Sequence, residues 1–267
     1  MAGRGESSDF IEALARGLDV IGAFSDERPS MTLSQLATAT QLARPTVHRL
    51  LVTLSELGFV RHRNGQFELT PKVLDLGYAY VSSLGMWHVA RPHLEDLVAV
   101  TGESSSMAQL SGSDIVYTAR VAVPKIIALR VEIGTRFPAA VTSQGKVLLA
   151  GLDDAAVTEL MGIPSASRVI VKRRDTFDLI DELRLVRARG WALADEELAP
   201  GVRSIAAPVT DASGTVVAAV NVTVHAAETT VDELVGRHLG ALLDTAAKIE
   251  ADWARVERRP VIVTGEE

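Results

Sequence analysis

The chain has 267 residues, of which 47% are hydrophobic and 23% charged, and its net charge at pH 7 is −7. Such a composition is typical of a soluble globular protein with one large domain or two of ordinary size. The absence of cysteine excludes disulfides, thiolate catalysis and Cys-based zinc sites, and no apolar run approaches the roughly 18 residues of a membrane span. We therefore expect no membrane partner and no signal peptide, and a cytoplasmic location fits these features.

The first segments of the chain predict three helices. Apolar residues at helical spacing indicate a helix over about 8–24, and the capping-box pattern of residues 32–35 starts a second, shorter helix. A third helix is predicted over 44–57. Pro45 fits its first turn, where a missing N–H is tolerated, and Gly58 fits the position just past its end.

Basic residues gather in one stretch of this acidic chain. Residues 43–67 hold four arginines and one glutamate, a net charge of about +3, and include Asn64-Gly65, which indicates a type I′ hairpin. Three helices and a basic hairpin form, in this order, a winged helix-turn-helix, whose recognition helix enters the major groove of double-stranded DNA. Arginine there can bond guanine, and threonine can contact a thymine methyl group or a phosphate. The residues that we expect at the DNA are Thr32, Ser34, Arg44, Pro45, Thr46, His48, Arg49, Arg61 and Arg63.

The remainder of the chain predicts a helical connection and then an α+β domain with an antiparallel sheet. We expect a linker helix over 71–86 and a helix over 87–102 that is kinked at or starts from Pro92. Strands are predicted at 104–112, 114–122, 126–134, 201–211 and 214–225. Helices are predicted at 142–152, at 153–162, at 176–190 with Thr176 as N-cap and Gly190 as its stop, and from the capping box at Thr230 to about Val256. Residues 259–267 are expected to form a tail.

A polar face runs along one predicted strand of this domain. Asn221, Thr223 and His225 alternate with valines, and Ser204 lies on a neighbouring predicted strand. Thr142 can cap the helix that follows it, and the first-turn N–H groups of that helix could hold a carboxylate. Apolar walls with a few convergent polar groups are typical of a small-ligand site. The alternative is that these residues form the wet face of a one-sided sheet.

Three long motifs resemble those of the IclR family of bacterial transcription regulators. They stand here as LARPTVHRLLVTLSELGFV, GTRFPAAVTSQGKVLLA and RGWALADEELAPGVRSIAAPVTDASGTVVAAVNVTVH, and the resemblance covers nearly the whole chain. It implies an α+β protein with a winged helix-turn-helix at 1–70, a linker at 71–86 and a GAF-like effector domain at 87–258. It further implies homodimers joined through their N-terminal domains, often paired as tetramers. Two further stretches, LTPKVLDLGYAYVSSL and GESSSMAQLSGSDIVYTARV, most resemble the branch that controls aromatic-acid breakdown through the β-ketoadipate pathway.

The same resemblance implies which residues line the effector site. Carried over by motif, they are Ile126, Leu129, Ser143, Gln144, Ala194, Val202, Ser204, Asn221 and Thr223. Ala194 stands where relatives often have aspartate, which removes a polar contact there, and Pro45 stands where they often have serine or threonine. Arg120 and Arg130 are candidate carboxylate partners whose orientation the sequence leaves open.

Three classes of function compete at this point. The first is a ligand-responsive regulator that binds a near-palindromic operator and senses a small organic acid, without a cofactor. The second is an enzyme that acts on a small acid and whose winged helix serves oligomerisation. The third is a winged-helix module that binds proteins. Asp195-Glu196-Glu197 is a candidate metal or acid–base cluster, but no histidine lies at ligand spacing and no nucleophile elbow or P-loop occurs. The motifs therefore favour the regulator.

Overall fold

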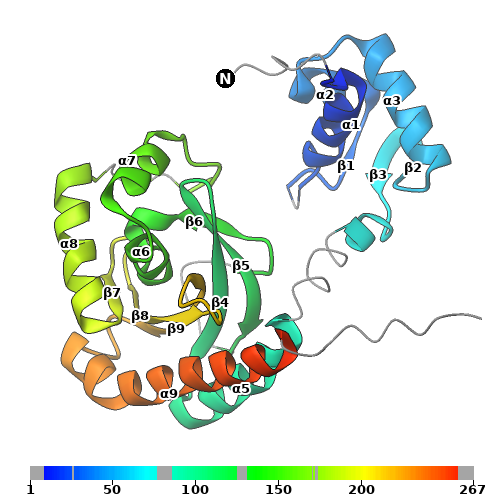
Figure 1. The fold of residues 1–267 in the computed structure, drawn as a ribbon. Coiled ribbons are helices and arrows are strands. Elements are labelled where there is room, and N and C mark those ends of the chain that lie inside the picture. Colours follow the sequence, from blue (N-terminus) through cyan, green and yellow to red (C-terminus); the bar gives the residue numbers. More distant parts are fainter. Residues whose placement is uncertain are drawn as a thin grey trace, which may run out of the picture. The chain divides into compact units, whose positions relative to one another are not determined.

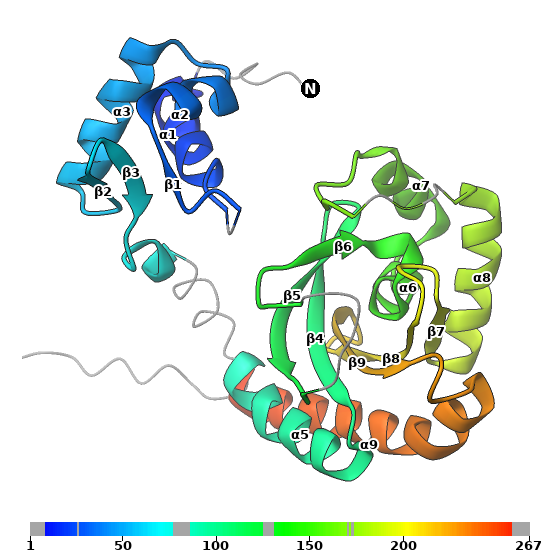
Figure 2. The ribbon, with the colours of Figure 1, turned by 180° about the vertical axis from the view of Figure 1, so that it is seen from behind.

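The computed structural model describes residues 9–25, 27–76, 86–124, 131–169, 171 and 174–257. The chain divides into two compact units, Met1–Ser83 and Leu84–Glu267 (Figures 1 and 2). Within the described ranges, no helix has both the length and the apolar character that a membrane span requires.

The N-terminal unit packs helices against a small antiparallel sheet with strand order β1-β3-β2. Its elements are α1 (Glu12–Gly22), β1 (Ser30–Met31), α2 (Leu33–Thr40), α3 (Arg44–Glu56), β2 (Val60–Arg63) and β3 (Gln66–Leu69). The turn between β2 and β3 has φ values of 52° at Asn64 and 78° at Gly65, which is the predicted left-handed geometry of a type I′ hairpin.

Local signals set the ends of α2 and α3 as predicted. Thr32 and Gln35 form a reciprocal capping box at the start of α2, and Pro45 lies in the first turn of α3. Val47 and Leu51 are fully buried on the inner face of α3. Gly58 has a φ of 79°, so it can follow the helix in a conformation that side chains with a Cβ rarely adopt.

The helix α1 carries an apolar face that its own unit leaves exposed. Ile11, Leu14 and Leu18 are 65%, 62% and 55% exposed, whereas Val20 is fully buried. The periodicity predicted the helix correctly, although α1 spans Glu12–Gly22 and is shorter than the expected 8–24. This stripe is more apolar than a solvent-facing helix needs to be, so it is a candidate contact surface.

The C-terminal unit is a single antiparallel sheet with helices on both faces. The sheet has strand order β6-β5-β4-β9-β8-β7, and Figure 1 shows α5 and α9 on one face and α6, α7 and α8 on the other. Its elements are α5 (Met86–Thr101), β4 (Ser104–Ser111), β5 (Asp114–Val121), β6 (Arg136–Pro138), the 3₁₀ helix η1 (Ala139–Val141), α6 (Ser143–Ala150), α7 (Asp154–Gly162), α8 (Thr176–Arg189), β7 (Ala192–Asp195), β8 (Val202–Thr210), β9 (Val216–His225) and α9 (Val231–Glu257). An α+β fold was predicted, and this arrangement agrees with it.

The sheet separates two hydrophobic cores. Val220, Val222 and Val224 of β9 pack in the core that α5 and α9 cover, whereas Ala219 packs in the core that α6 and α8 cover. Successive side chains of a strand point to opposite faces, so β9 contributes to both layers. The polar alternation predicted for this strand therefore faces the α6 layer instead of bulk solvent.

Two details of the predicted elements were wrong. The described part of the expected strand 126–134, residues 131–134, forms a turn in which Thr135 N donates to Glu132 O at 3.0 Å, and the edge strand is β6 instead. Asp175, and not Thr176, caps α8, because its carboxylate accepts from the N–H groups of both Phe177 and Asp178.

Other expectations are partly or wholly outside the described residues. The linker helix was predicted over 71–86, and within it the structure describes helix only at 73–76 and at Met86, the first residue of α5. Pro92 lies inside α5. Ile126, Leu129, Arg130 and the tail 259–267 are not among the described residues.

Candidate DNA-binding surface and effector pocket

The residues predicted to contact DNA lie on the surface of the N-terminal unit. Arg44, Pro45, His48 and Arg49 are exposed on α3, on the side away from its buried residues, and Thr46 is half-buried. The first turns of α3 therefore present basic and hydroxyl groups to solvent, as a recognition helix requires.

Several of these side chains also serve the fold. The Thr32 hydroxyl is used in the capping box, where it accepts from Gln35 N and lies 2.9 Å from Gln35 Oε1. Ser34 Oγ accepts from an Arg44 guanidinium nitrogen at 2.6 Å. These contacts orient Arg44 and the start of α2, so Thr32 and Ser34 act as supports whether or not they touch a phosphate.

The hairpin arginines differ in how their charge is balanced. Arg61 is 59% exposed and pairs with Glu68 on β3, with a guanidinium nitrogen 2.7 Å from the carboxylate, which neutralises part of its charge. Arg63 is exposed near the hairpin turn and forms no ion pair with any residue in the described ranges. His62 between them stacks on Phe67 at 4.5 Å between ring centroids. Arg44, Arg49 and Arg63 form no ion pair among the described residues, so the charge of each is free to meet a phosphate or a base.

A small cavity of about 30 Å³ lies in the C-terminal unit, where the start of α6 meets the sheet. It is lined by Tyr117, Arg120, Val131, Phe137, Val141, Thr142, Ser143, Gln144, Ala194, Leu198, Val202, Ser204, Asn221 and Thr223. The structure thus brings together Ser143, Gln144, Ala194, Val202, Ser204, Asn221 and Thr223, which the motifs had nominated as effector-lining residues. Sequence reasoning did not nominate Tyr117, Phe137 or Leu198.

A close contact joins η1 and α6 next to the residues of both elements that line this cavity. Gly145 lies against Ala139, and a Cβ added at Gly145 would lie 2.0 Å from the Ala139 carbonyl oxygen. Thr142 caps α6 by accepting from Gly145 N at 3.1 Å. The glycine and the cap together place Ser143 and Gln144 at the cavity wall, with the positive end of the helix dipole toward it.

Hydrogen bonds order most of the polar groups around the cavity. Ser143 Oγ and Ser204 Oγ lie 2.8 Å apart, and Asn221 accepts from Ser106 N at 2.9 Å and donates to Thr223 Oγ1 at 2.9 Å. Gln144 donates to two backbone carbonyls through Nε2, while its Oε1 is buried without a partner in the described structure. An unpaired buried acceptor is costly, so Gln144 Oε1 is a ready site for a ligand donor.

Arg120 supplies an unbalanced positive charge beside these groups. Burial lowers the pKa of Arg120, and the nearby Tyr117 opposes this shift. Its guanidinium donates to Ser106 Oγ at 3.0 Å, and no carboxylate of the described residues forms an ion pair with it. Burial raises the pKa of Tyr117 to about 12 despite the charge of Arg120, so the phenol is neutral at physiological pH. A half-buried guanidinium without a counterion favours a ligand carboxylate.

The other candidate groups have structural partners. His225 does not line the cavity; its Nδ1 accepts from Ala227 N at 3.2 Å. Asp195 pairs with Arg203 at 2.6 Å, and Glu197 pairs with the buried Lys146 at 2.5 Å. Within the part of the chain that the structure describes, no cluster of three histidine or carboxylate side chains is suited to a metal ion.

Comparison with known families agrees with both halves of this geometry. The model described as "Bacterial transcriptional regulator IclR C-terminal" matches residues 78–251, and the "IclR helix-turn-helix domain" model matches residues 13–64. The chain belongs to the IclR family of bacterial transcriptional regulators. IclR proteins are DNA-binding regulators, which decides against the enzyme hypothesis and against a purely protein-binding winged helix.

Curated relatives in this IclR family include regulators of aromatic catabolism. The chain is 41% identical over 242 residues to the Pca regulon regulatory protein of Pseudomonas putida, covering 88% of this chain and 81% of that protein. It is 34% identical over 223 residues to the p-hydroxybenzoate hydroxylase transcriptional activator of Acinetobacter baylyi, covering 80% and 82%.

Solved structures of IclR proteins share the fold. A transcriptional regulator from Rhodococcus sp. RHA1 is 44% identical, with a TM-score of 0.81 over 92% of this chain and 100% of that chain. An IclR homolog from Microbacterium hydrocarbonoxydans, solved as a complex with 4-hydroxybenzoate, is 23% identical, with a TM-score of 0.78 over 91% of this chain and 99% of that chain.

Proposed function

We propose that this IclR regulator senses a hydroxylated aromatic acid in the cavity at the start of α6. The observation that carries the proposal is Arg120, a half-buried guanidinium at the cavity without a carboxylate partner among the described residues. Gln144 Oε1 supplies an unpaired acceptor for a ligand hydroxyl, and Tyr117 and Phe137 supply aromatic walls. The names of two relatives, a Pca regulon protein and a p-hydroxybenzoate hydroxylase activator, support the same ligand class.

The cavity must widen to admit such a ligand. A volume of about 30 Å³ holds roughly two water molecules, which is less than one aromatic ring requires. The ligand therefore selects an expanded arrangement of the walls, and the difference in its affinity for the two arrangements is the signal. A coupling of about 1–3 kcal/mol between effector and DNA is the usual size for such a device.

We further propose that the DNA-bound form is a homodimer, paired in turn as a tetramer. The exposed apolar face of α1 supports contact between two N-terminal units, and two basic α3–hairpin units would then read a near-palindromic operator. Operator affinity should fall steeply as salt rises, because neutralised phosphates release counterions.

The test compares 4-hydroxybenzoate with its methyl ester, which keeps the ring and hydroxyl but lacks the charge. Calorimetry on the full chain should give at least about tenfold tighter binding of the acid, because a buried charge-assisted pair forms only with the carboxylate. Arg120→Gln should remove that preference. Arg136→Gln changes another half-buried arginine of the same unit that does not line the cavity, and it should retain the preference. If Arg120→Gln still prefers the acid tenfold, the carboxylate lies elsewhere.

A further inference from the structure

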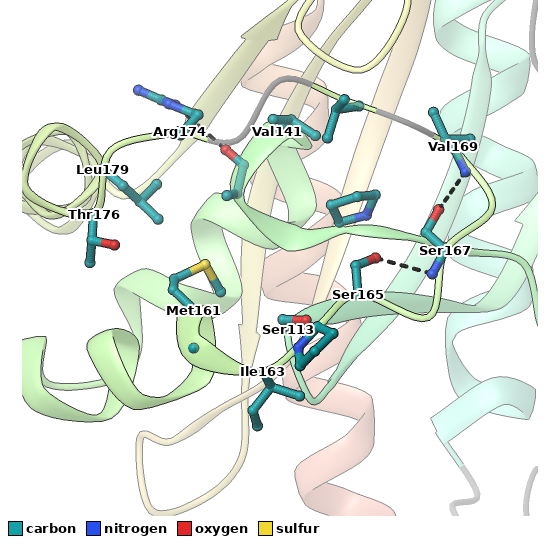
Figure 3. A pocket seen from close by; sticks show the side chains of 15 residues that line it. Ser113, Val141, Met161, Ile163, Ser165, Ser167, Val169, Arg174, Thr176 and Leu179 are labelled. Carbon is teal, nitrogen blue, oxygen red and sulfur yellow. Dashed lines mark hydrogen bonds between the residues drawn. The ribbon is translucent and has the colours of Figure 1, made fainter. Parts of the chain in front are cut away.

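A second and much larger cavity lies beside the small cavity of Arg120 and Gln144, which is called the acid site below. Its volume is about 420 Å³, and it is bounded by α7, η1 and the start of α8. Figure 3 shows Met161, Ile163, Leu179 and Val141 around this space, which is mainly apolar. Small-molecule sites usually occupy about 300–1,000 Å³, so this cavity can take an aromatic ring without any widening.

Ser113 gives the cavity a polar group that the fold does not use. Ser113 is 8% exposed and lines the cavity, and its Oγ has no hydrogen-bond partner in the described structure. Its backbone carbonyl is engaged, since it accepts from Ala139 N at 2.9 Å. A buried hydroxyl without a partner destabilises the protein. Ser113 Oγ has almost no accessible surface, so rotation about χ1 must turn it toward a ligand polar atom, and the hydrogen bond then formed would remove that cost.

Arg174 is the one charged side chain among the described residues that line this cavity, and it is already paired. Arg174 lies at its wall, but its guanidinium pairs with Glu182 and with Glu197 at 2.5 Å and 3.1 Å. The buried Asp114 carboxylate accepts from Ser165 Oγ at 2.5 Å and from Ala166 N at 2.8 Å. Among the described residues that line this cavity, no charged group is free to pair with an ionised ligand, in contrast to Arg120 at the smaller cavity. The lining therefore favours a neutral ligand.

We propose that this cavity is a second ligand site, for a neutral monocyclic aromatic compound with one hydrogen-bonding group. The ring packs against Met161, whose thioether suits an aromatic edge, and the polar group bonds Ser113. Val141 is buried and lines both cavities, so an occupant of the larger cavity braces a wall of the acid site. The protein thus has one site for an acid and one for an uncharged ring.

The experiment titrates the full chain with 4-methylphenol, which is neutral at pH 7, by calorimetry and ligand-observed NMR. We expect saturable binding with or without saturating 4-hydroxybenzoate. Ser113→Ala should weaken binding by about two- to tenfold, the usual effect of one lost hydrogen bond. Met161→Trp should abolish it, because Met161 lines this space and a larger side chain there would fill part of the cavity.

Two controls separate this site from the acid site and from misfolding. Ser204→Ala alters only the acid cavity and should leave 4-methylphenol affinity unchanged. Ser113→Ala removes an unpaired hydroxyl, so its melting temperature should not fall. Competitive displacement of 4-methylphenol by 4-hydroxybenzoate, an unchanged affinity in Ser113→Ala, or no saturable binding would each overturn the proposal. Because neither DNA nor acid is needed for binding, a failure of the proposed function would leave this result untouched.

Discussion

At the scale of single residues, the arginines of this chain fall into two groups. Arg61 pairs with Glu68, and Arg184 and Arg187 share Asp154, so carboxylates of the protein neutralise most of their charge. Arg49 and Arg120 have no acidic partner among the described residues. An arginine without an acidic partner in the protein is free to bind an external anion. Arg49 is such a residue in the N-terminal unit, and Arg120 is one in the C-terminal unit.

Arg49→Ala should weaken specific operator binding by about 1–3 kcal/mol, because a guanidinium that reads base edges is worth that much. Arg61→Ala is the matched control and should cost less, since its guanidinium is already paired with Glu68. Fluorescence anisotropy on operator and scrambled DNA measures both variants. Equal losses on the two DNAs would show that Arg49 contacts only the backbone.

A buried ionic cluster holds α6 to its neighbours. Lys146 is 1% exposed, and its ammonium lies 2.8 Å from Glu182 and 2.5 Å from Glu197, which also bind Arg174. Burial alone would raise the pKa of Glu182, but the hydrogen bonds and charges of Lys146 and Arg174 outweigh it, so the pKa lies below the ordinary 4.5. The stabilisation is therefore complete above pH 4.5 and is lost as the pH falls below that value.

Glu182→Gln should lower the free energy of unfolding by about 1–3 kcal/mol near neutral pH, since it leaves the buried Lys146 with one carboxylate fewer. Below pH 4.5 the difference from the unchanged protein should shrink, because Glu182 is then protonated anyway. Urea unfolding across this range measures both effects. Glu95→Gln, in an exposed pair with Arg91, should change neither the free energy of unfolding nor its pH dependence. If the loss in Glu182→Gln were the same at every pH, ionisation of Glu182 would not be the cause of the stabilisation.

At the scale of elements, the contact between η1 and α6 sets the geometry of the acid site. It depends on Gly145, because a Cβ there would overlap the Ala139 carbonyl. Any side chain at this position must push η1 away from α6. Val141 and Thr142 would move with it, and both line the acid cavity.

Gly145→Ala should therefore destabilise the C-terminal unit by about 3 kcal/mol or more and abolish effector binding. Gly236→Ala and Gly240→Ala in α9 are the controls, since a Cβ at either position meets no heavy atom within 4 Å beyond its own stretch of helix. They should raise the free energy of unfolding by about 0.5–1 kcal/mol, as alanine is the better helix former. Chemical denaturation followed by circular dichroism distinguishes the two outcomes. An unchanged Gly145→Ala variant would mean that η1 moves aside at no cost.

Elements with local signals could be predicted from the sequence, and elements set by distant contacts could not. Asn64-Gly65, Gly58 and the capping box at Thr230 act within a few residues, and each appears as predicted. The edge strand β6 forms because it pairs with β5, which precedes residues 125–130 in the sequence. The three residues of β6 are too few for a sequence pattern to indicate a strand. Asp175 was missed because Thr176 beside it is also a good capping residue.

The residues of the candidate site also divide into those with a local sequence signal, which were predicted, and those brought together by distant contacts, which were not. Asn221 and Thr223 were predicted because alternation with valine marks a polar face on β9, and Ser143 and Gln144 because they open a capped helix. Tyr117 and Phe137 join the cavity only through the β5–β6 pairing, which brings residues twenty positions apart into edge-to-face contact at 5.8 Å between centroids. No local pattern at Tyr117 or Phe137 signals a ligand.

At the scale of the whole molecule, the exposed face of α1 predicts the assembly state. Leu14→Asp places a charge in that apolar stripe, so it should dissociate the proposed homodimer. Operator affinity should then fall by at least about tenfold, since two linked half-sites bind as one unit. Sedimentation and gel-shift measurements report the two quantities. Leu185→Asp on α8 changes a leucine of similar exposure, 65% against 62%, and should leave both unchanged. If Leu14→Asp were a monomer with full operator affinity, the apolar face of α1 would not be a contact that operator binding needs.

The two-sided strand β9 has a consequence for how such a regulator diversifies. Asn221 and Thr223 line the small cavity, while Val220, Val222 and Val224 belong to the opposite layer. Substitutions at these two positions can alter chemical preference without disturbing the valine layer behind them. A combinatorial library that varies only Asn221 and Thr223 should therefore yield mostly folded proteins with altered ligand specificity.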